Sequence, residues 1–174
     1  MDARYLEASM KQRENYRSAI LDQMESAIEL LGPNHSLLRE MQARDGKLQK
    51  LYAELDEIGV GMTLATESGD SWALVLPDAS HPGCYRYSAF RSIGWTCHQT
   101  YRTLDEVVYR AFEAGYRVVA PRDTLEKLSK TAEWLKGCER LVFIEKMNAG
   151  EISYTQMLAE FAKIEASYAM SAAA

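Results

Sequence analysis

The chain has 174 residues, 47% of them apolar, and a formal net charge of −5. This composition suits one compact domain or two small ones and excludes a disordered chain. The negative charge argues against non-specific nucleic-acid binding through overall charge, and no apolar run approaches the roughly 18 residues that a membrane helix needs.

We expect a soluble, cytoplasmic protein. The start of the chain, MDARYLEASMKQRENYR, is polar and periodic and lacks the apolar stretch of a signal peptide. The three cysteines, Cys84, Cys97 and Cys138, are odd in number and lack the spacing of a disulfide framework. Reduced thiols are therefore expected rather than disulfides.

Residues 1–58 are expected to form an antiparallel helical hairpin that resembles a coiled coil. Apolar residues recur near a 3.5-residue spacing from Leu6 to Leu31, and again from Leu37 to Ile58. Gly32 and Pro33 separate the two stripes, and glycine ends helices while proline cannot continue one. The two apolar stripes should therefore face each other.

Residues 59–121 are expected to form a small, mainly antiparallel sheet with a packed helix. The segments VGMTLAT, SWALVLPD and YRVVAP predict strands, and ESGD predicts a tight turn between the first two. Thr103 and Glu106 have the spacing of a capping box at the start of a helix, and Gly115 can end that helix.

Residues 122–174 are expected to be helical. Asp123 and Glu126 form a second capping box, and Gly137 is expected to close that helix. The segment RLVFIEKM is short and ambiguous and favours a helix, NAG predicts a turn, and the last segment is amphipathic. The predicted fold class is α+β, with a helical hairpin at 1–58, a sheet and helix at 59–121, and C-terminal helices at 122–174.

The stretch GCYRYSAFRSIGWTCHQTYR, residues 83–102, holds five aromatics, three arginines, two cysteines and a histidine without an acid. With a turn at residues 92–94, its residues alternate between two faces, which is typical of a half-buried antiparallel hairpin. We expect the odd-numbered face to lie in the core: Tyr85, Tyr87, Ala89, Trp95, Cys97 and Tyr101. We expect the even-numbered face to be polar and exposed, with Phe90 on it near the turn: Arg86, Ser88, Thr96, His98, Thr100 and Arg102.

Two other interpretations of this stretch compete with the hairpin. Aromatics and arginines bind single-stranded nucleic acid when they share a face, but in the hairpin register they lie on opposite faces. His81, Cys84, Cys97 and His98 are zinc-ligand types, but adjacent residues of a strand point to opposite faces, so Cys97 and His98 cannot easily share one ion. We expect no metal and no cofactor.

Sequence motifs of catalysis are missing. The sequence has no phosphate-binding loop, no dinucleotide-binding glycine pattern, no nucleophile elbow and no HExxH. A cysteine with a histidine is the nearest catalytic pair, but sequence neighbours on a strand do not supply that contact. We therefore predict a protein that is not an enzyme.

The run GWTCHQTYRTLDEV, residues 94–107, followed by AGYR at residues 114–117, resembles strand–helix modules of small accessory proteins of plasmids and phages. The resemblance carries no catalytic residues. It implies an accessory protein of a mobile element, many of which bind and disable host machinery such as CRISPR effectors.

The sequence favours a non-enzymatic protein that binds a larger protein or complex, as an inhibitor or as an adaptor, and that has no membrane partner. Acidic side chains on the helical hairpin could occupy a basic groove of the partner. These candidate residues are Glu25, Glu29, Glu54, Asp56 and Glu57. Arg86, His98 and Arg102 offer a second surface, for which single-stranded nucleic acid is the alternative ligand. A homodimer through the N-terminal helices is a further alternative.

Overall fold

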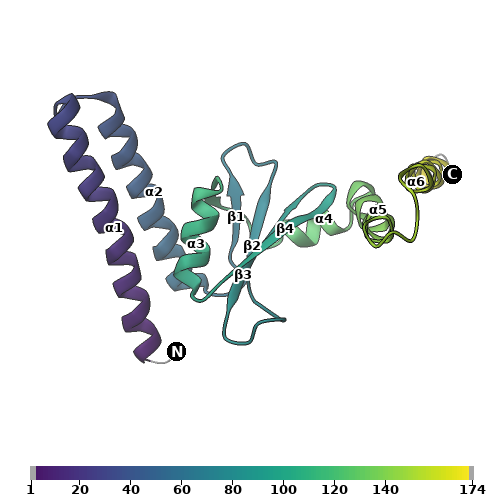
Figure 1. Ribbon diagram of the computed structural model, residues 1–174, viewed down its shortest axis with the longest axis horizontal. Coiled ribbons are helices and arrows are strands. Elements are labelled where there is room, and N and C mark those ends of the chain that lie inside the picture. Colours follow the sequence, from purple (N-terminus) through teal and green to yellow (C-terminus); the bar gives the residue numbers. More distant parts are fainter. Residues whose placement is uncertain (1–2, 173–174) are drawn as a thin grey trace. The chain divides into compact units, whose positions relative to one another are not determined.

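The computed structural model describes the backbone of residues 3–172 and the side chains of residues 11–170. It has the predicted α+β fold, with a helix pair, a five-stranded sheet and C-terminal helices (Figure 1). The elements in chain order are α1 (Ala3–Leu31), α2 (Ser36–Ile58), β1 (Thr63–Thr66), β2 (Trp72–Pro77), β3 (Tyr85–Arg91), β4 (Gly94–Tyr101), α3 (Leu104–Glu113), β5 (Tyr116–Val119), α4 (Thr124–Ser129), α5 (Ala132–Asn148) and α6 (Tyr154–Ala172).

The helices α1 and α2 form the predicted antiparallel hairpin (Figure 1). Gly32 follows α1 with a φ of +84°, a conformation that glycine adopts without strain, so the chain can reverse there. His35 caps α2, because its Nδ1 accepts a hydrogen bond from the backbone N–H of Leu37 at 3.3 Å. The side chains of Leu6 and Met10, part of the predicted stripe, lie outside the described residues.

The sheet has the strand order β4-β3-β2-β1-β5. β1 pairs antiparallel with both β2 and β5, and its register with β5 shifts between Ala65 and Thr66. α3 packs against α2, β2 and β5, and its inner face is almost fully buried. The core that α2, α3 and the sheet share includes Leu48, Leu51, Tyr52, Leu64, Val75, Val107, Val108 and Phe112.

The predicted start of α3 is confirmed, and Asp123 takes the predicted N-cap position of α4 but does not make the predicted capping bond. Thr103 Oγ1 accepts a hydrogen bond from the Glu106 backbone N–H at 3.1 Å. Asp123 makes no side-chain capping bond and instead pairs with Lys127 at 2.8 Å, one turn further along α4. The Asp123 backbone, with φ −87° and ψ 5°, is not in the extended conformation that a capping side chain usually needs.

The β3–β4 hairpin forms, but its burial differs from the prediction. Ser88, predicted on the exposed face, is only 6% exposed, and the consecutive residues Tyr87, Ser88, Ala89 and Phe90 of β3 are all buried, so both faces of this part of the strand are covered. Cys97, predicted in the core, is exposed. It belongs to β4, which ends the strand order and has one neighbouring strand.

The predicted odd–even alternation does not extend along the whole hairpin. Near the turn, Trp95 packs edge to face on Phe90, with ring centroids 5.3 Å apart. Near the other end, Tyr101 stacks on Tyr87, an odd-numbered residue of β3, at 6.4 Å. Since Phe90 and Tyr87 point to opposite faces of one strand, a single register cannot account for both contacts.

The chain divides into two compact units, one of residues 1–88 and 98–120 and one of residues 89–97 and 121–174. The helical hairpin and most of the sheet belong to the first unit. In the second, α5 packs against α6. The rings of Phe90, Trp95 and Trp134 meet there edge to face, with centroids between 5.3 and 5.8 Å apart.

The prediction that Gly137 ends a helix is wrong. Gly137 lies inside α5. A Cβ atom at this position would lie 1.6 Å from the backbone oxygen of Ile93 in the β3–β4 turn. Only glycine permits so close an approach between a helix and another backbone segment. The residue therefore marks a packing contact and not a helix end.

Candidate functional site

We divide the helical hairpin into a proximal half, residues 11–17 and 44–58, and a distal half, residues 18–43, which contains the turn between the helices. The distal half extends beyond α3 (Figure 1). The two halves differ in burial, charge and bonding.

Arg13 anchors the proximal half by binding two carboxylates. Its Nη1 and Nη2 donate to Asp56 at 2.8 and 2.7 Å, and its Nε donates to Asp105 of α3. Asp105 is 1% exposed, and the guanidinium lies over the Tyr52 ring, 4.6 Å from its centroid. Burial acts to lower the pKa of Arg13, but the bonds and charges of the two aspartates raise it well above its ordinary value. Arg13 therefore stays charged and joins α1 to α2 and α3.

A second contact in the proximal half joins α1 to α3. The rings of Tyr16 and Tyr109 are stacked, with centroids 4.0 Å apart and an interplanar angle of 2°. Gln12 donates to the Tyr16 hydroxyl at 3.0 Å and accepts from the Thr103 hydroxyl at 2.6 Å. The first half of α1 is thus fixed on α3 by aromatic and polar contacts.

The distal half exposes large apolar side chains. Leu38 is the only buried residue between positions 18 and 43. Leu30 is 83% exposed, and the other exposed members are Leu21 (49%), Ile28 (42%), Leu31 (47%) and Leu37 (40%). Leu21 and Ile28 are seven residues apart, so they lie on one side of α1. A patch of this kind at the end of a hairpin is typical of an interaction surface.

The distal half is also acidic. It contains four carboxylates and one arginine, which gives a net formal charge of −3: Asp22, Glu25, Glu29, Glu40 and Arg39. Glu25 follows Leu21 by one turn and precedes Ile28 by three residues, so it borders their side of α1. None of the side chains of Asp22, Glu25 and Glu29 forms an ion pair with a residue that the structure describes. We call these exposed apolar and acidic residues of positions 18–43 the distal surface.

Two hollows border the distal surface. One, of about 410 Å³, lies between the helix ends and is lined by Asp22, Ala27, Leu30, Leu31 and Leu37 together with Gln23 and Ser26. The other, also of about 410 Å³, is a groove between α2, α3 and β5, and Leu37 lines both. The apolar surface at the hairpin end therefore continues into a groove along α2.

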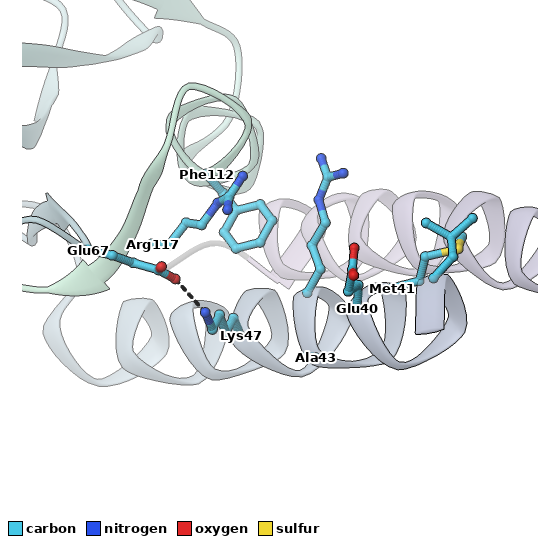
Figure 2. Close-up of a pocket in the computed structure, with 9 residues that line it drawn as sticks. Glu40, Met41, Ala43, Lys47, Glu67, Phe112 and Arg117 are labelled. Carbon is cyan, nitrogen blue, oxygen red and sulfur yellow. Dashed lines mark hydrogen bonds and ion pairs between the residues drawn. The ribbon is translucent and has the colours of Figure 1, made fainter. Parts of the chain in front are cut away.

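Figure 2 shows this groove. Met41 and Glu40 of α2 lie toward one end, and the Phe112 ring of α3 lies beside Arg117 of β5 toward the other. The ammonium of Lys47 binds the carboxylate of Glu67, and this bond holds the pKa of Glu67 below its usual range. One end of the groove thus holds Met41 beside the Glu40 carboxylate, and the other, the charged end, holds Lys47, Glu67 and Arg117.

The charged end of the groove has two arginines near Phe112. The guanidinium carbon of Arg117 lies 5.4 Å from the ring centroid and that of Arg44 lies 5.9 Å away. Arg44 also donates to Glu113 of α3. Arg117 differs, because its Nε is buried and has no hydrogen-bond partner among the described residues.

Asp78 is a strongly perturbed carboxylate of the sheet region. Thr100 Oγ1 donates to it, and the backbone N–H groups of Ser80 and His81 donate at 2.7 and 3.1 Å. These bonds, that of Thr100 foremost, hold the pKa of Asp78 well below its usual range. A carboxylate that stays charged and serves the backbone of its own loop anchors that loop and is a poor proton donor.

The acidic residues singled out from the sequence do not form one surface. Glu25 and Glu29 are exposed neighbours on the distal surface. Glu54, Asp56 and Glu57 lie near the end of α2, and the helical rise places Glu54 about 24 Å along α2 from Leu38. Glu54 is half-buried and Glu57 is exposed, while Asp56 is bound to Arg13.

The basic residues singled out from the sequence differ in exposure. Arg86 in β3 is half-buried, and its Nε has no partner among the described residues. His98 in β4 and Arg102 after it are exposed. The three residues thus differ in accessibility, since Arg86 is half-buried while His98 and Arg102 are exposed.

Among the side chains that the structure describes, no group of three or more histidines, cysteines, aspartates or glutamates could bind a metal ion. The three cysteines are free thiols. None of the described helices combines the length and the apolarity that crossing a bilayer requires.

Comparison of the chain with models of known protein families, with curated proteins and with solved structures finds no match. The site therefore rests on its geometry. The sequence does not predict the groove, because Arg117 and Phe112 belong to a predicted strand and a predicted helix with no sign that the two residues meet. The absence of lysine from residues 51–126, which makes Arg117 one of few cations there, is the single sequence signal for it.

Proposed function

We propose that this protein is a non-enzymatic protein-binding module that attaches to a larger protein or complex through the distal surface and acts on it as an inhibitor or an adaptor. The observation that carries the proposal is the distal surface itself. Five large apolar side chains between 40% and 83% exposed lie among carboxylates that form no ion pair with the described residues, on two helices whose other half is firmly packed. Exposed leucines cost solubility and contribute nothing to the core, which favours a role in binding.

The partner surface that fits is apolar and basic. The leucine and isoleucine side chains would be buried in an apolar hollow, and the carboxylates at the rim would face lysines or arginines of the partner. Charge complementarity of this kind raises the rate of association and excludes wrong partners. A second copy of the chain is a weaker candidate, because two distal surfaces of charge −3 would repel each other.

The proposal is tested by affinity capture from the cells that produce the protein, with Ile28→Asp compared with Leu158→Asp. The two side chains are equally exposed, at 42% and 45%, but Leu158 lies on α6 in the other compact unit. We expect a protein that the wild type and Leu158→Asp retain and that Ile28→Asp loses. Raising the salt from about 0.1 M to 1 M should weaken the complex, since the Debye length falls from about 10 to 3 Å.

Two results would contradict the proposal. One is equal retention of the same protein by both variants, which would place the binding surface elsewhere. The other is a chain that captures only itself, with a solution mass of twice the 19.7 kDa of one copy. That result would favour self-association through the helical hairpin.

A further inference from the structure

The furrow between α1 and α2 holds α3 in its proximal part. α3 packs against both helices of the hairpin. At its start, Thr103 donates to Gln12 of α1 at 2.6 Å, and at its end, Glu113 accepts from Arg44 of α2. The hairpin extends beyond this end (Figure 1). The proximal part of the furrow therefore shows which kind of element fits between the two helices, an amphipathic helix with a buried inner face.

Beyond the last turn of α3 the furrow continues as two connected hollows. The first, of about 200 Å³, is lined by Gln23 and Met41 together with Glu113 of α3. Gln23 also lines the hollow of about 410 Å³ between the helix ends, which Leu30 and Leu37 line too. The shared residue makes the two hollows one depression that starts where α3 ends. We call this depression the distal furrow.

The distal furrow suits a helix of about three turns. Its walls expose Leu30 and Leu37, at 83% and 40%, and the small side chains of Ala19 and Ala27 leave space between them. The helical rise from Ala19 to Leu30 is about 16 Å, the length of about three turns. Both walls are helices whose backbone groups are bonded within each helix, so a bound segment must satisfy its own N–H and C=O groups. A helix does so, and an extended segment does not.

Carboxylates that form no ion pair with the described residues stand on both walls of the distal furrow. Asp22 of α1 lines the second hollow, and Glu40 of α2 follows Leu37 by three residues and so borders the other wall. Arg44, the cation that lines the first hollow, is bonded to Glu113. The charge that the furrow leaves without a bonded partner is therefore negative, which favours a cationic occupant.

We infer that the distal furrow binds a basic, amphipathic helix of about three turns that belongs to the partner protein. The apolar stripe of this helix packs on Leu30 and Leu37, and lysines or arginines on its two flanks face Asp22 and Glu40. The inference rests on the proposed function for the origin of the helix. It assigns one side of the distal surface, since Ile28 precedes Leu30 by two residues and lies about 200° around α1 from it. The rest of the partner contacts the side of Ile28.

The test titrates the purified full chain with three peptides, blocked at both ends. The first, Lys-Leu-Ala-Lys-Leu-Leu-Lys-Lys-Leu-Ala-Lys-Leu-Leu-Lys, forms a helix with one leucine stripe between lysines. The second has the same composition in an order that spreads the leucines around the helix, and the third has glutamate in place of every lysine. We expect the first peptide to bind at least about tenfold more tightly than either of the others, because it alone combines the stripe with the positive charge. The backbone amide signals of Gln23 and Met41 in nuclear magnetic resonance spectra should shift saturably, and that of Leu158 on α6 should not move.

Two pairs of substitutions locate the site. Leu30→Asp and Ile28→Asp add the same charge to α1, but only Leu30→Asp puts it where the leucine stripe packs. We expect Leu30→Asp to weaken binding of the first peptide about tenfold and Ile28→Asp to change it less than about twofold. Glu40→Gln should weaken binding about threefold at low salt, whereas Glu25→Gln, which removes a carboxylate on the side of Ile28, should have a smaller effect.

Binding of the second or third peptide as tight as that of the first would overturn the inference, as would no binding at about 1 mM peptide or equal losses in Leu30→Asp and Ile28→Asp. Gln23 and Met41 signals that shift with protein concentration before any peptide is added would assign the furrow to a second copy of the chain instead. The inference and the proposed function fail separately, because Ile28→Asp is expected to lose the captured partner and to keep the peptide. Loss of capture by Ile28→Asp, with peptide binding that no substitution changes, would leave the proposed function standing and exclude the helix from the furrow.

Discussion

The proximal and distal halves of one helical hairpin are built on different physical principles. In the proximal half, α2 buries Leu48, Leu51, Tyr52 and Leu55 to 4% exposure or less, and Arg13 and Tyr16 bind across to α3. In the distal half, Leu38 alone is buried, and five large apolar side chains face solvent. The helices are continuous through both halves. Helix formation and tertiary stabilisation are therefore separate along this hairpin, and the half that contributes least to the core is available for binding.

The largest expected loss of stability in the proximal half comes from Asp105→Ala. The substitution removes a fully buried carboxylate from Arg13, whose side chain is only 21% exposed. Breaking a buried ion pair leaves an uncompensated charge, and Arg13 keeps only Asp56, so we expect a loss of about 3 kcal/mol in the free energy of unfolding. Urea unfolding of the variant measures this loss.

Asp56→Ala is the matched control for Asp105→Ala, since it removes the other partner of Arg13. The Asp56 side chain is 60% exposed, so water replaces much of its contribution, and we expect a cost of about 1 kcal/mol or less. If both variants cost the same, burial of Asp105 does not set the strength of the proximal contact.

A smaller effect is expected from Tyr16→Ala. The stacked Tyr16–Tyr109 pair is worth about 1 kcal/mol beyond its buried area, so the substitution should cost about 1.5 kcal/mol. Leu21→Ala, five residues further along α1, should cost about 0.5 kcal/mol or less because Leu21 is 49% exposed. A double-mutant cycle with Tyr109→Ala measures the coupling, and a coupling near zero would show that the stacked rings do not hold α1 on α3.

Tyr52→Phe tests the pH dependence of the proximal half. Burial, followed by the charge of Asp105, raises the pKa of the Tyr52 hydroxyl well above its usual value of about 10. The folded state therefore keeps this proton when the unfolded chain loses it, so the stability present at neutral pH is lost as the pH rises above about 10. Phenylalanine cannot ionise, and at pH 11 the variant should avoid about 1.4 kcal/mol of this loss.

At pH 7 the same variant should be as stable as the wild type or slightly more stable. The Tyr52 hydroxyl is buried and has no hydrogen-bond partner among the described residues, so its removal relieves an unsatisfied polar group. Unfolding free energies of the variant and the wild type at pH 7 and pH 11 give the stability difference at neutral pH and the loss that the variant avoids at pH 11. A variant that loses as much stability as the wild type between these values would show that Tyr52 ionises with the unfolded chain's pKa.

The sequence predicts those parts of the fold that depend on neighbours in the chain. The two apolar stripes, the break at Gly32 and Pro33, and the Thr103 cap are local patterns, and the structure confirms the hairpin and the start of α3. The pair of Arg13 and Asp105 is 92 residues apart in sequence, and no local pattern reveals it. The prediction that Gly137 ends a helix is wrong for the same reason, because the role of this glycine depends on the backbone of Ile93.

The candidate site divides in the same way. Glu25 and Glu29 can be placed on the hairpin from helical spacing alone, and the structure leaves them exposed. Glu25 and Glu29 do not share a surface with Glu54 and Glu57, because the two pairs lie far apart along the helices. The acidic composition alone does not show this distance. Arg117 needs the tertiary fold, since its relation to Phe112 and Lys47 arises only where β5, α3 and α2 meet.

The smallest expected change in stability is that of Leu30→Asp in the distal half. Leu30 is 83% exposed, so the substitution removes almost no buried area, and its unfolding free energy should stay within about 0.5 kcal/mol of the wild type. Urea unfolding at several protein concentrations measures it, because a leucine hidden in a complex of two copies would make stability depend on concentration. A loss above about 1.5 kcal/mol, independent of concentration, would mean that Leu30 supports the fold and would remove the contrast between the halves. A small effect on stability together with a loss of partner capture would instead separate binding from folding at a single side chain, as the proposed function requires.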